Sequence, residues 1–157
     1  MDDKLELLRH TLATLAYRCG KALRGAPPEF AEYRADAGSR TPAQILAHMG
    51  DLLDWGLSIC DARERWSDSP PLPLDTGAER FFTALQALDA RFAAAEPLAV
   101  APERLFQGPI ADALTHVGQL AMLRRLSGAP FHGENYFKAG IRVGSVSADQ
   151  PAPRQEF

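Results

Sequence analysis

The chain has 157 residues, enough for one domain with a real core and too few for two comfortable ones. Its hydrophobic fraction of 46% and charged fraction of 24% are those of a globular protein, which excludes a disordered chain. A net charge of -3, with scattered arginines, gives no reason to expect a nucleic-acid partner. We therefore expect a single domain over residues 1–157.

The N-terminal segment MDDKLELLRH is acidic and amphipathic, and it lacks the basic start and apolar run of a signal peptide. No apolar stretch approaches the roughly 20 residues that span a bilayer. Cys19 and Cys60 fall in separate predicted helices and form no CxxC pair, so we interpret both as small core or boundary residues in a reducing compartment. These features predict a cytoplasmic protein without a membrane partner.

Leucines at alternating three- and four-residue steps predict a first helix over about residues 3–24. Gly25 and the Pro27-Pro28 pair end this helix. The following segment, residues 29–39, has no sustained period and is expected to be a loop with at most one helical turn.

A second helix, over about residues 42–60, has the clearest start in the sequence. Thr41 is placed as its N-cap, Pro42 at its first position, and Gln44 can complete a capping box. After this helix the periodicity fades, and prolines 70, 71 and 73 predict a rigid, extended connection.

A third helix is expected over about residues 76–95, with Thr76 and Glu79 as a second capping box. Pro97 and Pro102 indicate the next loop.

A fourth helix is expected to follow Gly108-Pro109, over about residues 109–127. For the remaining residues, 131–157, we predict a C-terminal tail. Its first half is expected to pack on the helices and its last residues to fray. The fold class predicted is therefore all-α, an antiparallel four-helix bundle with a partly ordered C-terminal tail.

Three polar residues fall where a bundle needs apolar ones. His48 lies in an apolar stripe of the second helix, between Ile45 and Leu52, so its ring should point inward. Asp112 and His116 are four residues apart, so they share one face of the fourth helix. Burying a carboxylate and two imidazoles without partners would be costly.

A divalent metal ion would remove that cost, because imidazole nitrogens and a carboxylate are ligands for zinc, nickel and ferrous iron. Three protein ligands would leave coordination positions open for water or substrate. The alternatives are structural: His48 as a satisfied core histidine, Asp112 as an acid near the helix N-terminus, or Asp112 and His116 as a hydrogen-bonded couple. The residues alone leave both interpretations open.

The sequence also resembles the DinB-like family of bacterial four-helix proteins. The resemblance rests on TPAQILAHMGDLLDWGLSI around His48 and on FQGPIADALTHVGQLAMLRRLSGAP around His116, and it extends from Thr41 to about Gly140. Family members carry a metal on three ligands, and the last ligand is often followed by a G-Q element, here Gly118-Gln119. Where the family commonly has a second histidine near the end of the chain, this sequence has Asp112. The departure leaves open the identity of the metal: zinc or nickel is expected first, with iron as an alternative.

The resemblance implies a homodimer and a metal-dependent enzyme for a small-molecule substrate, of the thiol S-transferase or hydrolase type. Gln119 is the candidate for hydrogen bonding to a ligand, or else a boundary residue of the helix. Glu134 and Tyr136, with Asn135 between them, are candidate catalytic residues if the tail folds over the pocket; otherwise they form a surface turn. Trp55 is expected in core packing rather than as a substrate platform.

The rival hypothesis is a non-catalytic binding or stress-associated module, in which a metal serves structure or sensing or is absent. A di-iron carboxylate bundle is set aside, because the sequence has no Glu-x-x-His pair.

Overall fold

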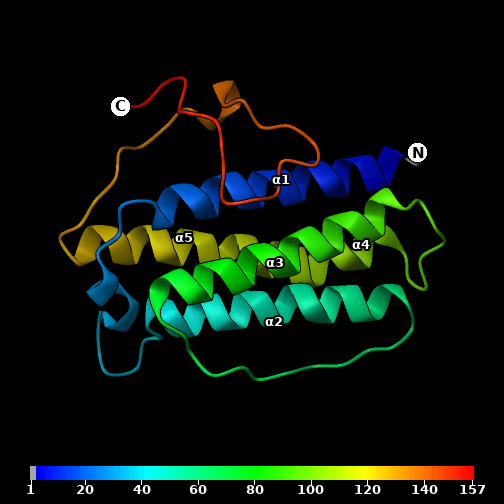
Figure 1. Cartoon of the computed structure of the whole chain (residues 1–157), viewed down its shortest axis with the longest axis horizontal. Coiled ribbons are helices and arrows are strands. Elements are labelled where there is room, and N and C mark those ends of the chain that lie inside the picture. Colours follow the sequence, from blue (N-terminus) through cyan, green and yellow to red (C-terminus); the bar gives the residue numbers. More distant parts are fainter. Residues whose placement is uncertain (1–2) are drawn as a thin grey trace.

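The computed structural model describes residues 3–157, and it is helical throughout its regular part (Figure 1). Within the described residues there is no β-strand, only one isolated bridge between Glu134 and Glu156. The all-α prediction is therefore confirmed. Four long helices form the bundle: α1 (Asp3–Leu23), α2 (Pro42–Cys60), α3 (Leu74–Ala93) and α5 (Ala111–Leu126). The shorter helical segments are η1 (Pro28–Glu32), α4 (Pro102–Leu105), η2 (Phe106–Ile110) and η3 (Tyr136–Lys138).

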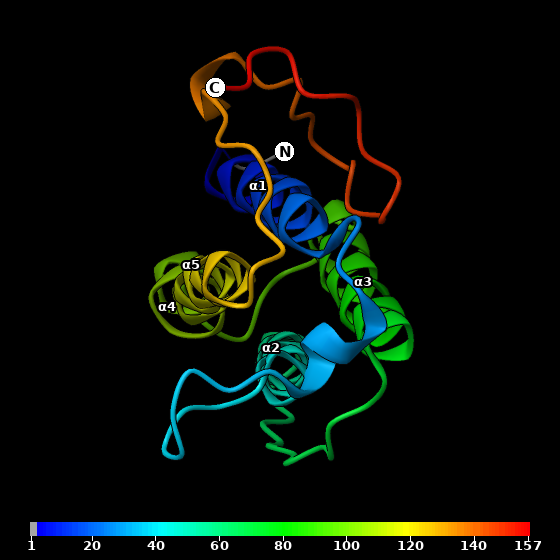
Figure 2. The same ribbon diagram turned by 90° about the vertical axis from the view of Figure 1, so that its left-hand side faces the viewer.

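The four long helices occupy the corners of a square in cross-section (Figure 2). Helix α1 packs against α3 and α5, and α2 packs against the same two helices. Helices α1 and α2 therefore lie on opposite corners. Helix α2, which carries His48, is a direct neighbour of α5, which carries Asp112 and His116.

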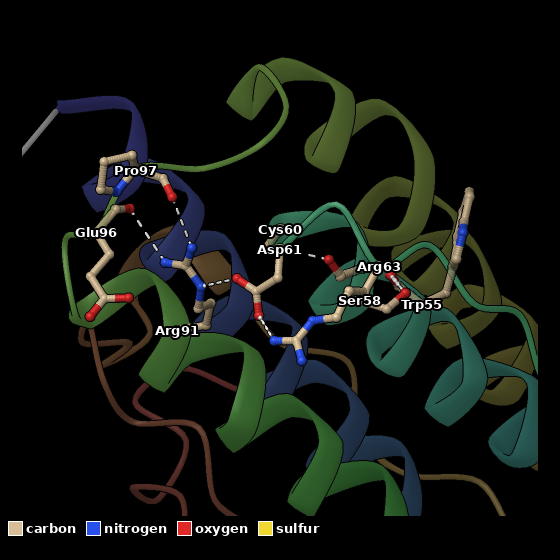
Figure 3. Close-up of polar contacts among 9 residues, drawn as sticks. Trp55, Ser58, Cys60, Asp61, Arg63, Arg91, Glu96 and Pro97 are labelled. Atoms are coloured by element: carbon tan, nitrogen blue, oxygen red, sulfur yellow. Dashed lines mark hydrogen bonds and ion pairs between the residues drawn. The ribbon is translucent and has the colours of Figure 1, made fainter.

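Helices α2 and α3 run in the same direction, which corrects the expectation of an antiparallel bundle. Arg80, early in α3, donates to Asp51 at the middle of α2 at 2.7 Å. Arg91, near the end of α3, donates to Asp61 just after α2 at 2.8 Å (Figure 3). Because both partners advance along the chain from the first ion pair to the second, the two helices are parallel.

Helices α1 and α5 are the second parallel pair. Arg124, near the end of α5, donates to the carbonyl of Ala22 at the end of α1 at 2.7 Å. Arg9, near the start of α1, pairs with Asp89 near the end of α3 at 2.8 Å, so α1 and α3 are antiparallel. Each long helix thus has one parallel and one antiparallel neighbour.

The connection of residues 61–73 makes the parallel α2–α3 pair feasible. It returns along the length of the 19-residue helix α2, a distance of about 28 Å (Figure 1). An extended chain of this length reaches about 40 Å, and Pro70, Pro71 and Pro73 favour extended backbone. The predicted rigid connection is therefore a crossover along the outside of the bundle.

The expected helix boundaries hold best where capping is local. The capping box of α2 is formed in both directions, since Thr41 Oγ1 accepts from the Gln44 amide at 3.2 Å and Gln44 Oε1 accepts from the Thr41 amide at 2.9 Å. Helix α3 begins at Leu74, two residues before the predicted start. Pro73 is its N-cap, and the predicted capping box at Thr76 is not formed.

Helical structure leading into the last bundle helix begins at Pro102, before the predicted start at about residue 109. Pro102, which was predicted to lie in a loop, starts α4, and a π-helical segment, η2, joins α4 to α5 with Pro109 inside it. Proline lacks the amide that an α-helical hydrogen bond needs, and a wider π turn accommodates that loss. Pro109 was therefore wrongly predicted as a helix start. It lies inside η2, the segment that leads directly into α5.

The C-terminal tail crosses α1 on the side away from α2 (Figure 2). Backbone hydrogen bonds join Asn135 to Gln155 at 2.9 Å and Phe157 to Gly133 at 3.0 Å, and Lys21 of α1 pairs with Glu156 at 2.8 Å. The prediction that the last residues fray is therefore wrong, because the two halves of the tail hold each other.

Cys19 and Cys60 are free and buried, as expected for small core residues. None of the helices in residues 3–157 combines the length and apolarity needed to cross a membrane.

Candidate metal centre

The three predicted ligands converge on the α2–α5 edge of the bundle. The capping box of α2 fixes the start of that helix, and His48 lies under two turns further along it. Asp112 and His116 lie one turn apart on α5, whose first residue directly follows the π-helical segment. Of the described residues, these three form the group of histidine and carboxylate side chains that is close enough to hold one ion.

The distances within the group match those of shared coordination. His48 Nε2 lies 3.6 Å from Asp112 Oδ2, and His116 Nε2 lies 3.4 Å from Asp112 Oδ1. Two tetrahedral ligands at about 2.1 Å from zinc are about 3.4 Å apart. One ligand atom from each residue lies within 4.8 Å of the others, so any pair at that limit would have to approach by about 1.4 Å around a tetrahedral ion.

The same distances weaken the interpretation of a hydrogen-bonded couple. An N–H···O hydrogen bond spans about 2.7–3.2 Å, and neither imidazole comes that close to Asp112. The His48 and His116 rings meet edge to face, with centroids 4.8 Å apart. The two rings and the carboxylate therefore gather within 4.8 Å of one another, and both His–Asp contacts are longer than an ordinary hydrogen bond.

Gln119 orients His116 for coordination. His116 Nδ1 lies 2.7 Å from Gln119 Oε1. Because an amide oxygen only accepts, this contact favours the tautomer with the proton on Nδ1, which leaves Nε2, the nitrogen 3.4 Å from Asp112 Oδ1, free to coordinate. This arrangement, with the second ring nitrogen donating to an oxygen, is the usual support of a metal-bound imidazole.

The environment of His48 favours the neutral ring that a metal requires. Burial lowers the pKa of His48 below its usual value, and the positive charge of Arg40 and the neighbouring His116 lower it further, while Asp112 opposes these effects. Near neutral pH, the ring of His48 is therefore already neutral and does not have to release a proton before it binds a metal.

The site opens to solvent through its carboxylate. The side chain of His116 is 10% exposed and that of His48 is 21% exposed, whereas Asp112 is 46% exposed. An ion held by these residues would have protein on the imidazole side and accessible coordination positions on the other, which is the arrangement of a reactive rather than a closed structural metal site.

Trp66 borders the site and was missed by the sequence analysis. Its ring lies edge to face with His48, centroids 5.6 Å apart, although it belongs to the crossover connection. Ser58 Oγ accepts from the Arg65 amide at 3.0 Å, and Asp51 accepts from the Ser69 amide at 2.8 Å, so the chain is held on both sides of Trp66. The only signal in the sequence was a large aromatic residue in an otherwise polar, proline-rich stretch.

Trp55 is partly buried and packs against the core, in line with its predicted role. Its ring also meets Trp66 edge to face, centroids 5.9 Å apart, and its Nε1 donates to Glu64 at 3.2 Å. Trp55 therefore helps to hold the Trp66 ring in its place beside His48.

The tail candidates lie elsewhere. Glu134 is buried against α1, where it accepts from the Tyr17 hydroxyl at 2.6 Å and lies 3.1 Å from Lys21 Nζ. The Tyr136 ring packs on Tyr17, and Asn135 Oδ1 accepts from the amide of Phe137. The structure brings none of the three to the His48–Asp112–His116 group, because the tail lies on the side of α1 away from α2 (Figure 2).

A pocket of about 390 Å³ adjoins the centre at His116. Its wall combines α5, the start of α2 and the loop before α2, and residues 29–39 of that loop have no periodic pattern that would have indicated a binding wall. The lining residues are Ala35, Ser39, Arg40, Ile45, His116, Gln119, Met122, Leu123 and Leu126.

No family model, curated protein or solved structure matches this chain.

Proposed function

We propose that this chain binds one divalent metal ion through His48, Asp112 and His116 and uses it to activate a thiol or a water molecule for reaction with a small molecule. The observation that carries the proposal is the 3.4 and 3.6 Å spacing of the two imidazole nitrogens from the two oxygens of one carboxylate. This spacing is longer than an ordinary N–H···O hydrogen bond and close to the separation of two ligand atoms around one zinc ion.

When bound, a divalent ion lowers the pKa of a coordinated thiol or water and so supplies a nucleophile near neutral pH. His48 and His116 would hold it as neutral donors, and Asp112 would add a negative charge at the solvent side. Gln119 keeps His116 in the tautomer that coordinates. Trp66 packs edge to face against the ring of His48.

Two imidazoles and one carboxylate suit zinc or nickel, and an open facial set of this kind also suits ferrous iron. The resemblance to DinB-like proteins in the stretches around His48 and His116 agrees with this proposal, and it extends the proposal to a transferase or hydrolase acting as a homodimer. The non-catalytic alternative, a binding or stress-associated module, uses the same three residues for structure or sensing.

Metal analysis of untagged protein tests the binding step. We expect about one zinc or nickel ion per chain after loading and gel filtration, and loss of that ion in His116→Ala and His48→Ala. Asp112→His should retain binding, since it restores a third nitrogen ligand, whereas Asp112→Ala should weaken it. His132→Ala is the matched control, because His132 lies outside the group.

Thermal unfolding separates a catalytic from a structural ion. A structural ion would stabilise the fold strongly, and its chelation would lower the melting temperature sharply. We expect a modest shift set by mass action, together with turnover of a thiol and an electrophilic acceptor that requires the metal. Less than about 0.1 ion per chain, with stability unchanged by chelator, would overturn the proposal.

A further inference from the structure

The pocket beside His116 has a lining with two distinct parts. Five apolar side chains form most of its surface: Ala35, Ile45, Met122, Leu123 and Leu126. Polar groups gather at the loop before α2 and at the edge of the metal centre. A volume of about 390 Å³ lies within the range of small-molecule sites.

Arg40 supplies the one full charge of this lining. No carboxylate lines the pocket, and within the described residues the Arg40 side chain forms no hydrogen bond or ion pair. An arginine beside an apolar hollow, without an acidic partner of its own, favours an anionic group of a ligand.

Two apolar side chains of the pocket are unusually open. Met122 is 62% exposed and Leu126 is 56% exposed, one turn apart on α5. An alkyl or aryl body lying along this turn would cover both, which removes apolar surface from water. The occupant therefore needs an apolar body as well as an anion.

Gln119 connects the pocket to the metal centre. Its side chain holds His116 Nδ1 at 2.7 Å and also lines the pocket. A molecule in the pocket therefore lies against the residue that orients a metal ligand, next to the position where an activated nucleophile would form.

We propose that this pocket binds a monocarboxylate with an apolar body, its carboxylate on Arg40 and its body on Met122 and Leu126. As the substrate site of the metal centre, this inference rests on the proposed function. As a binding site, it depends only on the pocket and can be tested without metal.

Octanoate is the probe, and labelled methionine methyl groups are the reporters. Met122 lines the pocket, whereas Met49 is fully buried in the core and serves as the internal control. In metal-free protein we expect saturable movement of the Met122 methyl resonance with octanoate and none of Met49. Octan-1-ol and octylammonium, of equal chain length, should bind several-fold more weakly.

Two arginine variants test the charge. Arg40→Ala should weaken octanoate binding at least about threefold, within the range of exposed ion pairs, and leave octan-1-ol binding unchanged. Arg104→Ala is the matched control, because Arg104 is exposed on α4 and does not line the pocket. Circular dichroism melting of both variants establishes that each folds.

Three other results would contradict the proposed binding of a carboxylate by Arg40. Equal binding of the three probes, or octanoate binding that Arg40→Ala leaves intact, overturns the inference. Octanoate binding seen only in zinc-loaded protein would place its carboxylate on the metal instead of Arg40. Movement of the Met122 resonance with protein concentration, without an octanoate effect, would assign the surface to a second copy of the chain.

The two proposals fail separately. If the His116→Ala protein loses metal but still binds octanoate in an Arg40-dependent way, the pocket stands without the metal chemistry. If one zinc ion binds per chain and octanoate does not, the metal site stands and this ligand class is wrong.

Discussion

His116 Nδ1 and Gln119 Oε1 are 2.7 Å apart, one turn along α5, and this contact fixes which imidazole nitrogen faces the candidate metal position. Gln119→Ala removes the acceptor, so the ring of His116 loses both its tautomer preference and its orientation. We expect metal affinity to fall about 10- to 100-fold, as for other oxygen partners of metal-bound histidines. Competition with a chromophoric chelator measures the change.

Gln119→Glu is the discriminating companion variant, because a carboxylate still accepts the Nδ1 proton. It should retain most of the affinity. If Gln119→Ala and Gln119→Glu both bind metal as tightly as the wild type, then Gln119 is a boundary residue of the helix with no role in the site.

His48 makes the stability of the metal-free protein depend on pH. Its pKa in the folded state lies below the usual value near 6.5, mainly through burial and then through Arg40. As the pH falls below 6.5, the unfolded chain takes up a proton that the folded chain resists, so stability falls until the lower folded pKa is passed. Urea unfolding at pH 7.5, 6.5 and 5.5 should therefore show a decline that His48→Gln reduces.

Arg40→Ala provides a second arm of the same measurement. Removing this positive charge should raise the pKa of His48 and shrink the pH-dependent decline, without abolishing it, because burial remains the larger cause. A decline identical in wild type and His48→Gln would show that other groups control stability in this range.

The second helix illustrates what the sequence can predict. Its capping box involves Thr41 and Gln44, three residues apart, so the hydrogen bonds that start the helix are local and can be recognised from residue types. The same holds for Asp112 and His116, because four residues on one helix place two side chains on one face. Their meeting with His48 was a hypothesis about packing, and the group's geometry agrees with it.

The direction of α3 could not be predicted in this way. A parallel α2–α3 pair depends on contacts 29 or more residues apart, such as those of Arg80 with Asp51 and of Arg91 with Asp61. No local pattern distinguishes such a pair from an antiparallel one. The position of Trp66 follows from that crossover, which is why a residue of the site escaped detection.

Pro109 failed as a boundary for a different reason. Proline disfavours an α-helical interior, and the prediction treated it as a helix start. The wider turn of η2 accommodates Pro109 within a helix, where its ring packs close to Gly56 of α2. Propensity was overridden by a tertiary contact that only the folded chain displays.

Tryptophan fluorescence should report metal binding directly. The chain has two tryptophans; Trp66 contacts His48, and Trp55 contacts Trp66. We expect nickel to quench the emission in a saturable titration with one ion per chain. Trp66→Phe should lose most of the quenching and Trp55→Phe should keep most of it, because only Trp66 touches a proposed ligand. Quenching that persists in His116→Ala would place the nickel elsewhere.

Gly50 and Gly118 form a matched pair for testing the network that holds the crossover. A Cβ at Gly50 would overlap the guanidinium group of Arg80, whereas a Cβ at Gly118 meets nothing within 4 Å. Gly118→Ala should therefore stabilise the fold by about 0.5–1 kcal/mol through helix propensity. Gly50→Ala gains the same propensity but displaces Arg80 from buried Asp51, so we expect a net loss of about 1–2 kcal/mol.

The double variant isolates that cause. In an Arg80→Ala background the obstruction is absent, so Gly50→Ala should become neutral or stabilising, and the difference from its effect in the wild type measures the coupling between the two positions. Urea unfolding of the four proteins gives the cycle. Gly50→Ala stabilising the wild type as much as Gly118→Ala does would mean that Arg80 is not held over Gly50. The crossover carrying Trp66 would then need another anchor.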